Sequence, residues 1–279
     1  MVDNLKLKSE GTIIIDTISL PGLSISSVDT AGISLNQLLR TESWQPAATE
    51  FTHMSSVLYG AKLIRAIEQS MILPLKGRDA KILDYGCGDG LTVDTLRHMG
   101  KSAIGYDVKI NETEFCYDDF DFIIEQAPYH LISVYDVVDH MNLDEISQMF
   151  SRLKKVLHGN GKIFLRVHPY CSIDGTHCFS PVNLAYMHLC LTPEEIKSQG
   201  IKDWDGLKVV RPLDFYDTLI SRSGFKTISK KTHNVPAAKF LDARMRKRIK
   251  SLHYEGIITD DELDKLLSIN LIDYLLTLA

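Results

Sequence analysis

Three glycines and two acids in the stretch LDYGCGDG are well suited to bind a ligand. Gly86, Gly88 and Gly90 stand where the chain must turn sharply after a short apolar run, and Asp84 and Asp89 flank them. Backbone N–H groups in such a loop can hold an anion when the loop opens a helix. A carboxylate beside a phosphate is a like-charge contact, however. The two acids therefore favour a ligand that carries positive charge.

A dinucleotide is the obvious competitor for this loop. Its fingerprint, G-x-G-x-x-G, is incomplete because the sixth position is Leu91. S-adenosylmethionine fits better, since it has no phosphate and carries an ammonium group that Asp84 can hold directly or through water. Asp107 follows at about the distance at which ribose-binding acids occur, and it can accept hydrogen bonds from both ribose hydroxyls. An NAD(P)-dependent oxidoreductase is the alternative that Leu91 and Asp84 disfavour.

A strand, a helix and a second strand are expected to position these residues. The apolar run that ends at Tyr85 predicts the first strand, and residues 91–99 have helical spacing. Residues 102–106 predict a second strand that closes on Asp107. This βαβ unit brings the glycine loop to the carboxyl end of the first strand, where open parallel sheets bind their ligands.

The motif LDYGCGDG followed by GYD resembles the glycine-rich and acidic-loop motifs of class I S-adenosylmethionine-dependent methyltransferases. The resemblance implies an α/β fold with a Rossmann-like doubly wound sheet of the seven-stranded methyltransferase type. It also implies that Asp84, Gly86 and Gly88 border the methionine part of the cofactor and that Asp107 holds the ribose. Cys87, inside the same loop, is counted with the cofactor-binding residues.

Four further residues are candidates for contact with the cofactor. Asp118 follows an expected short strand near residues 115–117, where relatives place a polar residue against the adenine amino group, although DDFDF offers other acids. Tyr135 and Asp136 end the expected fourth strand in HLISVYDVVDHM, which resembles a turn that meets the cofactor in the family. Trp44 precedes an expected helix and either caps the site or covers core surface.

Three histidines are candidates for removing a proton from the methyl acceptor. His168 follows the expected fifth strand, residues 162–167, and an imidazole titrates near neutrality. His177 is the second candidate, and His140 the third, although relatives mostly use a histidine at that position to hold the turn together. Both His168 and His177 belong to a polar insertion, residues 168–208, that is expected to hang over the active edge of the sheet.

The same insertion contains residue types that zinc prefers, namely His168, Cys171, His177 and Cys178. Their spacing matches no common zinc pattern, and adjacent His177 and Cys178 would chelate one ion poorly. We therefore predict no metal and keep a zinc-binding module as an alternative. Hydrogen bonds to loop backbone are the other explanation for these polar side chains.

The amino-acid composition argues against several classes of function. The chain has 279 residues, 44% of them hydrophobic, and a net charge of −5, which argues against a surface built mainly for nucleic acid. No apolar run approaches the ~20 residues that span a bilayer, and we see no signal-peptide core. Five cysteines without a paired framework fit a reducing compartment, so we expect a soluble, cytoplasmic protein that does not bind membranes.

We expect three segments along the chain. Residues 1–45 form an N-terminal hairpin that turns at Pro21–Gly22, together with a cofactor-covering segment. Residues 46–235 form the methyltransferase core, and residues 236–279 form a helical C-terminal extension. The hairpin or the C-terminal helix is a candidate homodimer contact. The basic cluster from Arg244 to Lys250 is either a solvated helix face or a phosphate-binding surface.

Methyl transfer mainly needs alignment of donor and acceptor, so the acceptor cannot be deduced from catalytic residues alone. We expect transfer to O, N or C of a small polar or nucleotide-like molecule. A nucleic acid or protein acceptor is the second hypothesis. A non-catalytic S-adenosylmethionine-binding subunit is the third.

Overall fold

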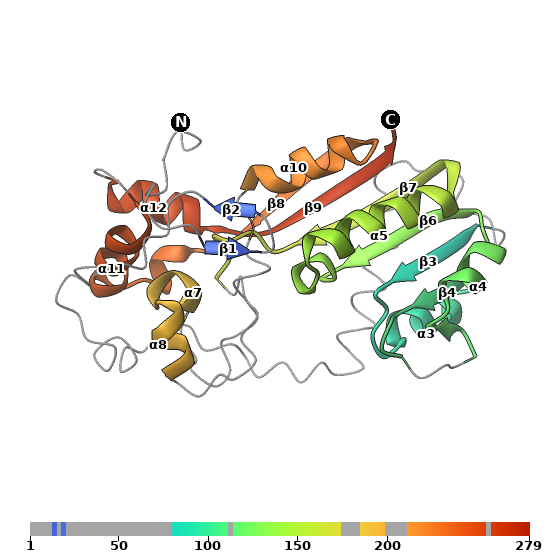
Figure 1. Cartoon of the computed structure of the whole chain (residues 1–279), viewed down its shortest axis with the longest axis horizontal. Coiled ribbons are helices and arrows are strands. Elements are labelled where there is room, and N and C mark those ends of the chain that lie inside the picture. The colour runs from blue at the N-terminus through green and yellow to red at the C-terminus, as the bar shows by residue number, and fades with distance from the viewer. Residues whose placement is uncertain are drawn as a thin grey trace.

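The computed structural model describes residues 13–15, 18–20, 80–110, 114–173, 185–198, 211, 213–254 and 258–279. Seven strands form one sheet of order β5-β4-β3-β6-β7-β9-β8 (Figure 1). The strands are β3 (Lys81–Tyr85), β4 (Ser102–Tyr106), β5 (Cys116–Tyr117), β6 (Tyr129–Tyr135), β7 (Leu157–Val167), β8 (Phe225–Asn234) and β9 (Ile269–Leu278). The first five are parallel, and β9 runs antiparallel to both β7 and β8. The predicted α/β class and seven-stranded Rossmann-like sheet are confirmed.

Helices cover the sheet on both faces. The helices are α3 (Leu91–His98), α4 (Phe120–Glu125), α5 (Leu143–Val156) and α10 (Leu213–Arg222), and the short helix η2 (Val138–His140) follows β6. Buried side chains of α5 and α10 pack with alternate residues of β3, β6, β7 and β9 in the largest core. Val93 and Leu96 of α3 pack against the other face. Helix α5 begins at a capping box, in which Asn142 and Glu145 bond each other's backbone N–H groups.

A second core lies beside the sheet and belongs to a smaller unit. We call this unit the helical subdomain; its described elements are α7 (Met187–Cys190), α8 (Pro193–Ser198), η3 (Ala237–Lys239), α11 (Ala243–His253) and α12 (Asp260–Leu267). Figure 1 shows α7, α8, α11 and α12 grouped away from the parallel strands. Leu189, Met245 and Leu263 share one apolar cluster there. The segment after β7 and the C-terminal helices, which sequence analysis treated separately, therefore pack together.

The C-terminal end corrects one expectation. Residues 236–279 were predicted to be helical, but the last strand, β9, lies inside the main sheet between β7 and β8. Ile272, Tyr274 and Leu276 are buried on one side, and Leu275 is buried on the other. A strand that is buried on both faces is apolar at nearly every position. Its sequence therefore lacks the two-residue alternation of a half-exposed strand and cannot be distinguished from a buried helix. This run misled the prediction.

The N-terminal hairpin exists and is separate from the main sheet. Strand β1 (Ile13–Ile15) pairs antiparallel with β2 (Ile18–Leu20) in a two-stranded sheet of its own. Ile15 pairs with Ile18, so the described strands both lie before the predicted turn, and Pro21 and Gly22 themselves lie outside the described residues. Trp44, His177, Cys178 and the helix expected over residues 51–71 lie outside the described residues.

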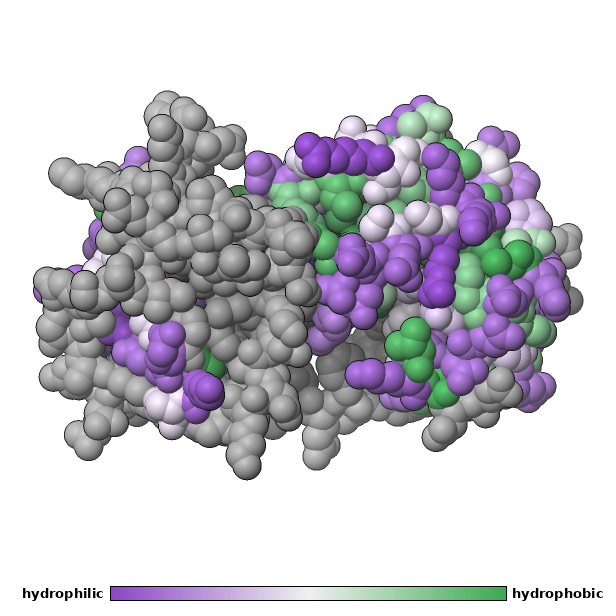
Figure 2. Space-filling model, viewed as in Figure 1, coloured by the Kyte–Doolittle hydropathy of each residue, from purple (hydrophilic) through white to green (hydrophobic). Residues whose placement is uncertain are grey.

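The described surface is mostly polar. Figure 2 shows hydrophobic residues in separate patches among hydrophilic ones on the described part of this face. Large apolar side chains that are exposed include Met99, Val108, Ile124 and Ile228. A search of the described residues for a helix long and apolar enough to cross a membrane finds none.

Candidate functional site

The glycine loop after β3 adopts a conformation that favours glycine. Gly86, Gly88 and Gly90 have φ angles of +80°, +55° and +78°, in the left-handed region. A Cβ atom on Gly86 would lie 2.3 Å from Cγ2 of Val137, so this loop touches the turn after β6. The N–H groups of Gly86 and Cys87 donate to the carbonyl oxygen of Tyr106 at 2.7 and 3.1 Å. The loop is therefore held close over the ends of β4 and β6.

Asp107 faces this loop from the end of β4. Its Oδ2 accepts a hydrogen bond from the Gly88 N–H at 3.0 Å, and its Oδ1 accepts one from the Lys109 N–H at 3.0 Å. Two backbone donors therefore fix the orientation of the carboxylate beside the loop. An acid in this orientation still has lone pairs available for the hydroxyls of a ribose.

A cavity of about 600 Å³ opens beside the loop. It is lined by Tyr85, Gly86, Tyr106, Asp107, Val108, Lys109, Asp136, Val137, His140, Met141, Glu145, Gln148 and Arg152. The wall comes from the ends of β3, β4 and β6 and from one side of α5. Four predicted site residues, Gly86, Asp107, Asp136 and His140, thus meet around one space. This space is large enough for an adenosyl ligand.

Asp84 lies just behind the loop and is buried. Burial raises the pKa of this carboxyl from 3.8 to about 7; a hydrogen bond with Ser133 lowers it and the nearby Asp107 charge raises it. A buried carboxylate with no nearby cation destabilises its own charged form. A cationic group of a ligand would relieve that cost. The loop and Asp84 together therefore fit the ammonium end of S-adenosylmethionine.

Three other predicted cofactor residues lie in different surroundings. The side chain of Cys87 is buried and packs with Cys116 against Gly105, where an added Cβ would lie 2.6 Å from the Cys87 sulfur. Asp118 is exposed after β5 and is not among the described residues that line the cavity. The Tyr135 hydroxyl accepts a hydrogen bond from Arg166. These residues remain predictions, and only the backbone of Cys87 lies in the loop itself.

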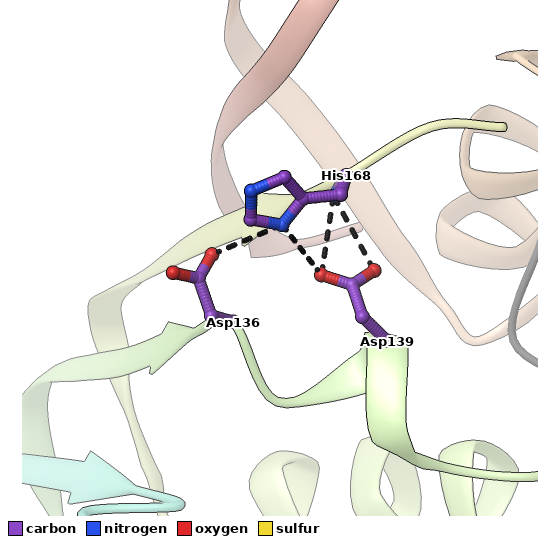
Figure 3. A group of neighbouring side chains, drawn as sticks. All are labelled: Asp136, Asp139 and His168. Carbon is purple, nitrogen blue, oxygen red and sulfur yellow. Dashed lines mark hydrogen bonds and ion pairs between the residues drawn. The ribbon is translucent and has the colours of Figure 1, made fainter. Parts of the chain in front are cut away.

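His168, at the end of β7, meets two acids from the turn after β6 (Figure 3). Its Nδ1 lies 3.0 Å from Oδ2 of Asp139, and its backbone N–H lies 3.2 Å from the same oxygen. The Tyr216 hydroxyl of α10 reaches the other Asp139 oxygen at 3.3 Å. Asp139 is buried, so these donors hold a carboxylate that water does not reach. Figure 3 shows the second ring nitrogen of His168 on the side of the ring away from Asp139.

Asp136 has a less satisfied environment than Asp139. Its backbone φ is +55°, an unusual value for a residue with a side chain. Its Oδ1 is buried, lies 3.4 Å from His168 Nδ1, and accepts no hydrogen bond from the residues that the structure describes. Burial raises the pKa of Asp136 to about 6, while His168 lowers it and Asp139 raises it.

Asp136, Asp139 and His168 also offer three metal-ligating atoms that lie within 4.8 Å of one another. The hydrogen bond from an imidazole N–H to Asp139 accounts for this approach without an ion. The predicted alternative, a zinc set, is not assembled in the described part of the chain: the buried Cys171 thiol contacts the Ile269 carbonyl at 3.7 Å, inside the helical subdomain. His177 and Cys178 lie outside the described residues.

The basic cluster of α11 is largely neutralised within the chain. Its ion pairs are Arg244 with Asp242, Arg246 with Asp264, Arg248 with Glu195 and Lys250 with Asp260. Arg248 is also fully buried. Paired and buried cations contribute little to phosphate binding. These contacts therefore give no support to a nucleic-acid surface on this helix.

Sequence reasoning missed several residues of the site. Asp139 lies three positions after Asp136, and two acids at the end of one strand are a signal that was available. Tyr216 and Arg152 come from α10 and α5, whose residues reach the site only through tertiary packing. Nothing in their local sequence distinguishes them from other helix residues.

Comparison with protein families gives one match to this chain. Residues 53–208, more than half of the chain, match the model of a family described as a methyltransferase domain. A comparison with curated protein sequences found no significant match.

Three of the solved structures to which this chain is similar are described as methyltransferases. A SAM dependent methyltransferase from Archaeoglobus fulgidus has a TM-score of 0.47 and 13% identity, over 79% of this chain and 93% of that chain. A plantazolicin methyltransferase in complex with SAH has a TM-score of 0.46 and 14% identity, over 82% of this chain and 86% of its own. A glycopeptide N-methyltransferase complexed with sinefungin has a TM-score of 0.44 and 8% identity, over 79% of this chain and 94% of that chain.

Proposed function

The chain belongs to the methyltransferase-domain family, and from that premise we propose that it moves the methyl group of S-adenosylmethionine to O, N or C of a small polar or nucleotide-like acceptor. The cavity at the carboxyl edge of the sheet supports this proposal because it joins the glycine loop to Asp107. When bound, the cofactor would supply an electrophilic methyl group bonded to its sulfonium sulfur.

The residues of this chain hold the cofactor by its two ends. Asp107 accepts from the ribose hydroxyls, since two backbone N–H groups already orient its carboxylate. The left-handed glycines keep side chains out of the space that the ligand fills. Asp84 favours the cationic end, because its buried carboxyl ionises more readily beside a positive charge.

His168 acts as the base that removes a proton from the acceptor. The observation that carries this role is the 3.0 Å contact between its Nδ1 and Asp139 (Figure 3). A carboxylate that accepts a hydrogen bond from Nδ1–H favours the tautomer in which Nε2 is the basic nitrogen, and it stabilises the imidazolium that forms. Tyr216 acts through Asp139 as a positioning residue.

The test is transfer of labelled methyl from S-adenosylmethionine to fractions of cell extract. We expect His168→Asn and Asp139→Asn each to lower the rate by roughly 10²–10⁴-fold, because general-base catalysis contributes about that much. Binding of SAH, measured by calorimetry, should stay within about threefold of wild type, since neither side chain is expected to hold the cofactor.

His158→Asn is the matched control, because His158 lies at the amino-terminal end of β7, at the end of the strand opposite to His168. Equal loss of activity in this control would contradict a specific role for His168. SAH binding with no label in any fraction would instead favour a non-catalytic cofactor-binding subunit. Absence of SAH binding would remove the methyltransferase proposal altogether.

A further inference from the structure

Asp136 carries a carboxylate that the chain itself leaves incompletely paired. It lines the cavity, yet its Oδ1 is buried and accepts no hydrogen bond from the described residues. His168 Nδ1 is 3.4 Å from this oxygen but is already bonded to Asp139 at 3.0 Å. A buried carboxylate oxygen without a donor costs free energy, so it calls for a partner that arrives with a ligand.

The charges near Asp136 define what that partner should be. Asp136 and Asp139 both flank His168, which places two carboxylates beside one imidazole, so negative charge is in excess whether or not the imidazole carries a proton. The nearest strand-end cation, Arg166, is bound by both oxygens of Asp273, at 2.6 and 2.7 Å. Its charge is therefore already matched. This end of the cavity has a local excess of negative charge, which attracts a cation and repels a carboxylate or phosphate.

We propose that the methyl acceptor is an amine that enters as an ammonium ion and binds Asp136 through an N–H bond to its carboxylate. The inference rests on the proposed function and narrows its acceptor from O, N or C to a basic nitrogen. An ammonium supplies the hydrogen-bond donor that Asp136 Oδ1 lacks, and a charge-assisted bond of this kind is stronger than a neutral one.

The chemical step balances with the residues present. One ammonium proton moves to Nε2 of His168, and the imidazolium that results is stabilised by Asp139 and Asp136. The nitrogen lone pair then forms a bond to the methyl carbon, while the electrons of the carbon–sulfur bond return to sulfur. The acceptor leaves as a methylated ammonium, and the His168 proton passes to water.

A neutral or acidic acceptor fits this site less well. An alcohol or phenol could donate a hydrogen bond to Asp136, but it would bring no positive charge to offset the two carboxylates. A carboxylic acid would arrive as an anion beside two carboxylates. Each like-charge contact in a partly desolvated site disfavours binding.

The first experiment blocks amines in the acceptor pool. Cell extract is treated with acetic anhydride and then with hydroxylamine, which removes acetyl groups from oxygen but leaves them on nitrogen. We expect wild-type protein to transfer at least tenfold less labelled methyl to this extract than to extract given pre-hydrolysed anhydride. Equal labelling of the two extracts would overturn the inference.

The second experiment replaces Asp136 and separates acceptor from cofactor. We expect Asp136→Asn to lower labelling at least tenfold at limiting extract and to recover part of it as the extract is concentrated, because acceptor binding is weakened. SAH binding by calorimetry should change less than threefold. A loss of SAH affinity as large as the loss of labelling would overturn the inference, because Asp136 would then hold the cofactor's own amino group.

Two controls distinguish the remaining explanations. Asp144→Asn, at an exposed acid on the first turn of α5, should leave labelling unchanged. Treatment with EDTA followed by Mg²⁺ or Mn²⁺ tests whether Asp136, Asp139 and His168 bind a metal ion instead. Labelling that is lost with EDTA and restored by metal would overturn the inference in favour of a metal site. If untreated extract acquires no label although the protein binds SAH, the proposed methyltransferase activity itself is refuted.

Discussion

In the helical subdomain Arg248 is fully buried and bonded to Glu195 and to the Cys190 carbonyl. At the carboxyl edge of the sheet, by contrast, Asp84 is buried without a matching cation among the described residues, and the buried Oδ1 of Asp136 accepts no hydrogen bond from them. The subdomain also satisfies its histidines: His188 and His253 bond the carbonyls of Tyr170 and Leu189 at 2.5 and 2.9 Å. The two regions therefore use the same kinds of residue for different purposes.

The difference separates a scaffold from a site. Buried polar groups with partners, such as Arg248, His188 and His253, help define one packed arrangement, and losing a partner is costly. Groups left short of partners destabilise the free protein but are available to a ligand. We infer that the subdomain is built to keep its shape, while the sheet edge keeps binding capacity at some cost in stability.

The two regions should also respond to pH in opposite directions. The pKa of Asp84 is raised, so the folded protein holds a proton that the unfolded chain has lost, and stability falls as pH rises from about 4 to about 7. Burial lowers the pKa of His188 to about 4, although its bond to Tyr170 opposes this. Stability from His188 is therefore present above pH ~6.5 and is lost as pH falls toward 4.

The largest effect is expected from breaking the buried pair in the subdomain. Arg248→Met should lower the free energy of unfolding by about 3–5 kcal/mol. It removes the cation that pairs with Glu195, which keeps only the Thr192 N–H among the described donors, and it removes the Arg248 donor from the Cys190 carbonyl. Urea denaturation measures the change. Arg244→Met removes a more exposed ion pair from the same helix and should cost at most about 1 kcal/mol. Equal losses of unfolding free energy in Arg248→Met and Arg244→Met would show that the buried pair does not stabilise the subdomain more than an exposed one.

A smaller effect of opposite sign is expected at the sheet edge. Asp84→Asn should raise the free energy of unfolding of the ligand-free protein by about 2–4 kcal/mol at pH 8, because it removes a buried charge. At pH 5 the gain should shrink to about 1–2 kcal/mol. The same variant should bind S-adenosylmethionine at least tenfold more weakly by calorimetry. A destabilised variant would show that Asp84 is already compensated in the free protein.

The smallest effect is the acid response of His188. Moving from pH 7 to pH 5 should cost the wild-type protein about 2 kcal/mol more than His188→Gln, whose amide can still donate to the Tyr170 carbonyl but does not titrate. Hydrogen exchange of α7 and α11 amides measures the difference within the subdomain. Identical pH profiles for the two proteins would mean that His188 does not contribute to acid sensitivity.

The sequence alone determined the part of the site that one βαβ unit contains. The glycine loop, helix α3 and Asp107 are close along the chain, so their spacing was enough to place the loop and Asp107 at one edge of the sheet and to show the methyltransferase resemblance. His168 was also predicted at a strand end, but its partner Asp139 was not chosen. Short-range geometry is encoded locally in turns and periodicity, which is why these elements were readable.

Only the tertiary structure decided the rest. The leucine-rich C-terminus became strand β9 because its two hydrogen-bonding edges pair with β7 and β8, and no local pattern states which neighbours a segment will have. Asp139, Tyr216 and His168 come from three separate elements, and their hydrogen bonds exist only once the sheet and α10 have packed. The incomplete pairing of Asp136 likewise depends on burial, which arises from long-range contacts and not from residue type.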